Sequence, residues 1–87
     1  MPAITMYTTG WCPYCARARA LLERKGAEWA EIDVEAEPAR RAEMLAKSGG
    51  QRSVPQIFIG ERHVGGSDDL YELDRKGELD ALLKQDA

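Results

Sequence analysis

The sequence predicts an α/β fold in which one mixed four-stranded sheet is flanked by helices. Two observations carry this prediction. Strand and helix patterns alternate over the first half of the chain, which favours a right-handed parallel βαβ unit. A proline-led apolar strand, a short hairpin and helical patterns follow, so the expected order is β-α-β-α-β-β-α with one more short helix at the end. The 87 residues predict a single domain, 1–87.

The first two strands are recognised by alternation. Residues 3–7 (AITMY) are rich in β-formers and place Ile4 and Met6 on the same face. Residues 28–34 (EWAEIDV) alternate in the same way and predict a second strand. One face of this second strand is expected to hold Ala30, Ile32 and Val34.

A helix is expected between these two strands. Residues 16–25 (ARARALLERK) are strong helix formers, and Gly26 ends the run. Pro13 suits the first helical position, where its missing N–H costs nothing, and this makes Cys12 the N-cap.

A second helix is expected from Pro38 to Lys47, because proline favours a helix start and residues 48–50 (SGG) provide a stop. Its buried stripe is predicted to be Ala42, Leu45 and Ala46.

The second half of the chain predicts a strand, a hairpin and two helices. Residues 53–59 (SVPQIFI) form the expected third strand, with proline at its entrance because proline cannot donate to a ladder. A tight turn at 60–61 leads to a short strand at 62–64, whose His63 is expected to be exposed. The helices are expected to reach Lys76 and to span 78–84.

Charge and hydropathy exclude some classes of function. The net charge is −3 and the 12 Lys and Arg residues are dispersed, so no nucleic-acid surface is expected. No apolar stretch is long enough to cross a membrane, and the N-terminal residues lack a secretory-signal pattern. We therefore expect a soluble, cytoplasmic protein, in which a C-x-x-C pair is more often catalytic than structural.

The chemistry is predicted at Cys12 and Cys15, which have the spacing of a dithiol redox centre. At the helix N-terminus, the sulfur of Cys12 can accept hydrogen bonds from the N–H groups of Tyr14 and Cys15, and the helix dipole also favours thiolate over thiol. Cys12 is therefore the predicted attacking sulfur. Cys15 lies on the same helix face and is expected to be less exposed, so we predict that it resolves a mixed disulfide.

Other interpretations of this region are weaker or remain open. A disulfide between cysteines so close in sequence closes a very small loop and stabilises little. A zinc site needs about four ligands, and beyond this pair the chain offers only His63, so no metal is expected. Trp11 is either a core residue or a partly exposed docking surface beside the sulfur.

Residues 65–69 (GGSDD) suggest a second functional element. Paired glycines allow a sharp turn and a close approach to a ligand, and Ser67 is a good N-cap. The segment is either only a helix start or a backbone N–H nest for a carboxylate, with Asp68 available for an ammonium group.

Three segments, 12–15 (CPYC), 53–59 (SVPQIFI) and 65–70 (GGSDDL), resemble those of the glutaredoxin family, in particular its small bacterial dithiol members with a thioredoxin-like fold. The resemblance covers essentially the whole chain, and the three segments in this order are highly specific. It implies that the bond before Pro55 is cis, although the base rate for proline favours trans.

The resemblance also implies a glutathione groove between the three segments. Val54 would pair its backbone with the cysteine of glutathione, and Ser67 and Asp68 would hold the γ-glutamyl end. Thr9 stands where many members carry a lysine. The implied groove residues are Tyr14, Gln51, Arg52, Ser53, Val54, Pro55, Gly66, Ser67 and Asp68, with Trp11 and Pro13 in supporting positions and Gln51 or Arg52 replacing the lysine contact to the glycine carboxylate.

By this resemblance, the expected function is reduction of glutathione mixed disulfides and protein disulfides by a monomer. Glutathione is the co-substrate, no cofactor is tightly bound, and glutathione reductase acts indirectly through glutathione. Two alternatives remain open. Trp11 and Thr9 favour a thioredoxin-like reductant supplied by thioredoxin reductase, whereas residues 65–69 oppose it. A dimer holding a [2Fe–2S] cluster through Cys12 and glutathione is disfavoured by Pro13 and Tyr14.

Overall fold

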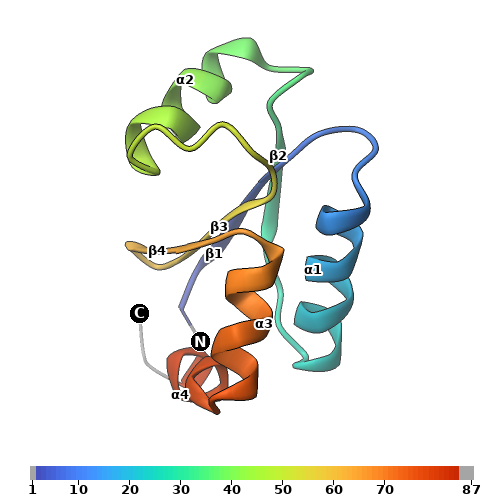
Figure 1. Ribbon diagram of the computed structural model, residues 1–87, viewed down its shortest axis with the longest axis vertical. Helices are drawn as coiled ribbons and strands as arrows, with labels where there is room; N and C mark the ends of the chain where they lie inside the picture. The colour runs from blue at the N-terminus through green and yellow to red at the C-terminus, as the bar shows by residue number, and fades with distance from the viewer. Residues whose placement is uncertain (1, 85–87) are drawn as a thin grey trace.

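A four-stranded mixed sheet lies at the centre of the protein, whose computed structural model describes residues 2–84 (Figure 1). The strand order is β2-β1-β3-β4; β2 is parallel to β1, and β3 is antiparallel to both β1 and β4. The predicted fold class and element order are confirmed. The strands are β1 (Ile4–Thr8), β2 (Ala30–Asp33), β3 (Gln56–Ile59) and β4 (Arg62–Gly65), and the helices are α1 (Pro13–Arg24), α2 (Pro38–Lys47), α3 (Ser67–Arg75) and α4 (Glu78–Lys84).

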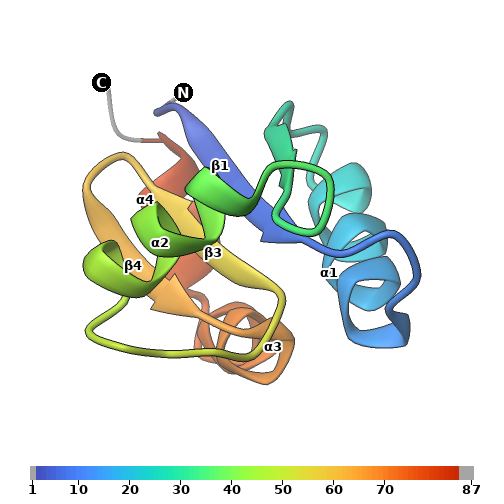
Figure 2. The same ribbon diagram turned by 90° about the horizontal axis from the view of Figure 1, so that it is seen from above.

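Helices cover both faces of the sheet (Figures 1 and 2). The larger core lies under α1, α3 and α4, where Ile4 and Met6 of β1 share a cluster with Leu70. On the other face, α2 contributes Met44 to a smaller cluster with Tyr7. The alternation predicted for the first strand is therefore confirmed, because neighbouring residues of β1 enter opposite cores.

The second strand is shorter than predicted. β2 spans Ala30–Asp33 rather than residues 28–34, and it pairs only with β1 because it is an edge strand. Of the three residues expected on its inner face, only Val34 is buried; Ile32 is half-buried and Ala30 is exposed. An edge position leaves part of that face without a helix above it.

The third strand also starts later than predicted. β3 begins at Gln56 rather than at residue 53, because Pro55 has no N–H to give to the ladder. The bond between Val54 and Pro55 is cis, as the resemblance implied. Residues 53–55 therefore form a loop wall in front of α1 rather than the start of a strand.

The buried stripe predicted for α2 was wrong. Ala42 and Ala46 are exposed and Leu45 is half-buried, whereas Met44 and Ser48 are buried. These last two residues are four apart and share one helix face. Ala42 and Ala46 are each two residues from Met44 and therefore face away from the core that Met44 enters.

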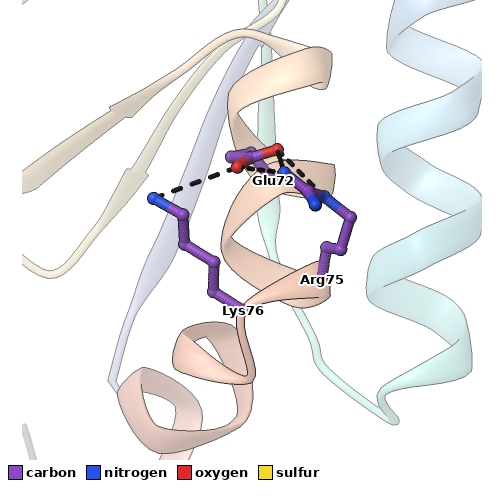
Figure 3. A network of polar contacts seen from close by, with 3 residues as sticks. All are labelled: Glu72, Arg75 and Lys76. Carbon is purple, nitrogen blue, oxygen red and sulfur yellow. Dashed lines mark hydrogen bonds and ion pairs between the residues drawn. The ribbon is translucent and has the colours of Figure 1, made fainter.

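The outer surface of α3 carries a small ionic network (Figure 3). Glu72 pairs with Arg75, whose Nε lies 3.2 Å from a carboxylate oxygen, and with Lys76 at 3.9 Å. These exposed pairs join residues three and four apart at the C-terminal end of α3, and such pairs contribute little to stability. Among the described residues 2–84, no helix is long and apolar enough to cross a membrane.

Candidate active site

The C-x-x-C motif occupies the N-terminus of α1, as predicted. Cys12 is the N-cap with extended backbone, and Pro13 takes the first helical position. The N–H of Cys15 donates to Cys12 Sγ over 3.4 Å. Within residues 2–84 the bond expected from the Tyr14 N–H is not formed, because the N-cap side chain reaches the third helical N–H instead. One helix N-terminus thus carries both cysteines, of which Cys12 is half-buried and Cys15 is buried.

Cys12 faces the loop that precedes β3. Its Sγ lies 3.8 Å from the Val54 carbonyl oxygen, within range for a thiol hydrogen bond. Two exposed aromatic side chains flank the sulfur in sequence: Trp11 is 85% exposed and Tyr14 is 53% exposed. The core interpretation of Trp11 is therefore wrong, and an aromatic surface lies beside the half-buried Cys12.

Cys15 has a different environment from Cys12, although both are free thiols. Cys15 is fully buried. The pKa of the Cys15 thiol is raised to about 12, mainly by burial and further by a hydrogen bond with Cys12. A hydrogen bond with the Thr9 backbone and the charge of Arg19 lower this pKa, but by less. The thiol of Cys15 is therefore protonated at neutral pH.

A pocket of about 420 Å³ opens beside the loop wall. It is lined by Tyr14, Gln51, residues 53–56 and residues 63–69, so it brings together the first helix, the loop before β3 and the start of α3. These are the three segments that sequence analysis grouped. Segments far apart in the chain form one groove because β3 and β4 connect them as neighbours in the sheet.

The start of α3 differs from the prediction in its cap. Gly66, not Ser67, is the N-cap, and the Gly66 N–H donates to the Asp69 carboxylate over 2.9 Å, which is one half of a capping box because glycine has no side chain. Ser67 is instead the first helical residue. Its hydroxyl is buried at the pocket, and no group within residues 2–84 hydrogen-bonds to it. A buried polar atom without a partner is costly, and a ligand in the pocket can supply that partner.

The protein-family model described as Glutaredoxin matches residues 4–64, which is more than half of the chain. The chain belongs to the glutaredoxin family. It is 58% identical to a glutaredoxin of Pseudomonas aeruginosa over 83 residues, covering 95% of this chain and 98% of the relative. Glutaredoxins are thiol-disulfide oxidoreductases, and this protein is such an enzyme.

Solved glutaredoxin structures share the fold. A solution structure of glutaredoxin from Brucella melitensis is 60% identical with a TM-score of 0.83, covering 97% of this chain and 90% of that one. A crystal structure of a buckwheat glutaredoxin-glutathione complex is 35% identical with a TM-score of 0.84, covering 92% of this chain and 74% of that one.

Most of the residues that the resemblance assigned to a groove do line the pocket. Arg52 is the exception, because it is exposed and lies outside the lining. Gln56 and His63 also line the pocket, although neither was predicted to do so from the sequence. His63 is half-buried rather than exposed, because its ring stacks on Phe58 with centroids 4.9 Å apart. The two-residue hairpin turn could have predicted this burial of His63, because such a turn places Phe58 opposite His63 in the strand pair.

The contrast between the two thiols predicts selective labelling. With the reduced protein at pH 7 to 8, iodoacetamide is expected to modify Cys12 alone, because Cys15 is buried and only its thiolate would react. Intact-mass and peptide mass spectrometry measure this. Labelling of Cys15 in the folded protein is expected only as the pH approaches about 12. Urea-unfolded protein, as a control, takes two labels; two labels on the folded protein at pH 7 would contradict the assignment.

Proposed function

We propose that this enzyme depends on glutathione and reduces both glutathione mixed disulfides and protein disulfides. The observation that carries the proposal is the polar pocket next to Cys12, with the hydroxyl of Ser67 buried and unpartnered at the N-terminus of α3. A helix N-terminus with free N–H groups suits a carboxylate, such as that of the γ-glutamyl end of glutathione. The structural likeness to a glutaredoxin-glutathione complex supports the same ligand.

In the proposed binding mode, three parts of the pocket lining each contact a different part of glutathione. Ser67 and the exposed carboxylate of Asp68 take the γ-glutamyl carboxylate and ammonium groups, respectively. The backbone of Val54 pairs with the cysteine of glutathione, which brings the glutathione sulfur toward Cys12. Gln51 lies in the lining and is the proposed contact for the glycine carboxylate; Arg52 assists from outside the lining.

For a mixed disulfide, the proposed first step is attack of the Cys12 thiolate on the glutathione sulfur. A bond forms between Cys12 and glutathione, the original S–S bond breaks, and the target protein leaves as a thiolate that takes up a proton. A second glutathione thiolate then attacks the bound glutathione sulfur, which releases oxidised glutathione and regenerates the Cys12 thiolate. Cys15 has no part in this cycle.

For a protein disulfide, Cys12 attacks one target sulfur and Cys15 resolves the resulting mixed disulfide. Cys15 must lose its proton as it attacks Cys12, and the departing target thiolate gains one. Two glutathione molecules later reduce the Cys12–Cys15 disulfide. The raised pKa of Cys15 favours this order of events, because a protonated Cys15 does not compete with Cys12 for the first attack.

We propose a cytoplasmic monomer as the working form. Both thiols and all the pocket walls come from one chain, and a reducing compartment supplies the glutathione that the cycle consumes. Glutathione reductase then connects the cycle to NADPH without contacting this protein. The net charge of −3 gives no reason to expect a nucleic-acid partner.

Steady-state reduction of a peptide-glutathione mixed disulfide tests the proposal, with NADPH, glutathione and glutathione reductase in one arm and NADPH and thioredoxin reductase in the other. Turnover in the glutathione arm is the expected result. Turnover with thioredoxin reductase alone would replace the proposal by a thioredoxin-like function, which the exposed Trp11 favours. A brown protein after anaerobic purification would instead indicate an iron–sulfur dimer.

A further inference from the structure

His63 and Gln56 line the pocket, yet the mechanism above uses neither. Gln56 in β3 is 1% exposed, and the His63 ring in β4 stacks on Phe58 with an interplanar angle of 29°. Gln56 Oε1 lies 2.7 Å from His63 Nε2. A buried amide and a stacked imidazole in contact form a built arrangement rather than two solvated side chains.

The hydrogen bonds around the Gln56 amide have one consistent assignment. Its Nε2 lies 2.9 Å from the Ser53 carbonyl oxygen and 3.3 Å from Ser53 Oγ. A carbonyl oxygen only accepts, so the amide nitrogen must face Ser53 and the amide oxygen must face His63. Since that oxygen also only accepts, His63 Nε2 carries the hydrogen and donates it.

This hydrogen-bonded chain ends at the wall beside the reactive sulfur. Residues 53–55 precede β3 and lack its ladder bonds, so the Gln56 amide ties Ser53 to β3 and, through His63, to β4. Val54 follows Ser53 directly, and its carbonyl oxygen lies 3.8 Å from Cys12 Sγ. The position of Val54 relative to Cys12 is thus coupled to a histidine on the neighbouring strand.

We propose that His63 is a positioning residue for glutathione. By donating to Gln56 it fixes the orientation of the amide, which in turn holds Ser53 and Val54 where the glutathione backbone pairs. Without this donor the buried amide oxygen of Gln56 loses its partner, so only the bonds to Ser53 hold the amide and the loop at Ser53 and Val54 is held less firmly. The inference rests on the proposed glutathione dependence.

Two variants of His63 separate hydrogen bonding from packing. His63→Phe keeps the stack on Phe58 and removes the donor; His63→Gln keeps an N–H donor and removes the aromatic ring. His63→Phe is expected to raise the KM for the peptide-glutathione mixed disulfide roughly three- to tenfold, the effect of one lost hydrogen bond, with little change in kcat. His63→Gln is expected to restore most of the KM.

Equal KM values for His63→Phe and the unchanged protein would overturn the proposal, as would a larger loss in His63→Gln than in His63→Phe. Urea unfolding of both variants verifies that they are folded. Hydrogen exchange of the backbone amides of residues 51–54 gives a second readout that needs no glutathione, and His63→Phe is expected to accelerate it. If the protein without substitutions does not use glutathione, the proposed function is wrong. The exchange measurement remains informative in that case: equal exchange rates in the His63→Phe variant and in the protein without substitutions would show that His63 does not position the loop.

Discussion

Replacing Cys12 with serine is expected to reduce turnover below detection with both glutathione mixed disulfides and protein disulfides. A serine hydroxyl is not ionised at neutral pH and does not attack a disulfide sulfur, and no other thiol can substitute because Cys15 is fully buried. The coupled glutathione reductase assay measures the first activity, and reduction of a protein with an exposed disulfide measures the second. A Cys12→Ser variant that retained either activity would refute the assignment of the attacking sulfur.

Cys15→Ser is the matched control, because it makes the same replacement of sulfur by oxygen at the second cysteine of the motif. This variant is expected to keep mixed-disulfide turnover at the same order of magnitude, since that cycle uses Cys12 alone, and to lose dithiol reduction of protein disulfides. It is also expected to accumulate one glutathione adduct on Cys12 when treated with oxidised glutathione. Loss of mixed-disulfide turnover in Cys15→Ser would mean that the resolving thiol takes part in both cycles.

The difference between these two cysteines was predictable because it depends on local structure. A proline at the first helical position, followed by strong helix formers, sets Cys12 as the N-cap and Cys15 one turn further along the same face. The three segments could be grouped only through the family resemblance, since nothing local to residues 53–55 or 65–69 brings them together. In the structure their proximity follows from the strand order β2-β1-β3-β4.

The errors arose where tertiary packing decides between similar local patterns. For α2, the predicted stripe followed the spacing of Ala42, Leu45 and Ala46, whereas the packing of the helix against the sheet buries the face that holds Met44. For α3, both Gly66 and Ser67 are acceptable caps, and the Asp69 carboxylate decides for Gly66.

The same Asp69 gives the largest stability effect that we expect outside the hydrophobic core. Gly65→Ala is expected to lower the free energy of unfolding by about 2–4 kcal/mol, the sum of backbone strain and a lost helix cap. Gly65 has φ +113°, a conformation that side-chain-bearing residues rarely adopt. A Cβ at this position would lie 2.4 Å from Asp69 Oδ2, so the carboxylate must leave the Gly66 N–H. Urea unfolding measures the change.

Gly66→Ala is the neighbouring control. Gly66 has φ −90°, and a Cβ there would first meet the Pro55 carbonyl oxygen at an ordinary contact distance of 3.6 Å. Its stability change is therefore expected to stay within about 1 kcal/mol, because only the modest preference for glycine over alanine at an N-cap is lost. A loss in Gly66→Ala as large as that in Gly65→Ala would mean that the whole turn, rather than its one clash with Asp69, tolerates no side chain.

A double-mutant cycle separates the clash from the strain. Asp69→Ala alone is expected to cost about 1 kcal/mol through loss of the cap. In the Asp69→Ala background the carboxylate is absent, so Gly65→Ala should cost only the backbone strain, and the two changes together should cost less than their sum. Additive costs would mean that the carboxylate is not displaced. Because α3 begins at Ser67 in the pocket lining, the turn tested by this cycle lies directly beside the proposed glutathione site.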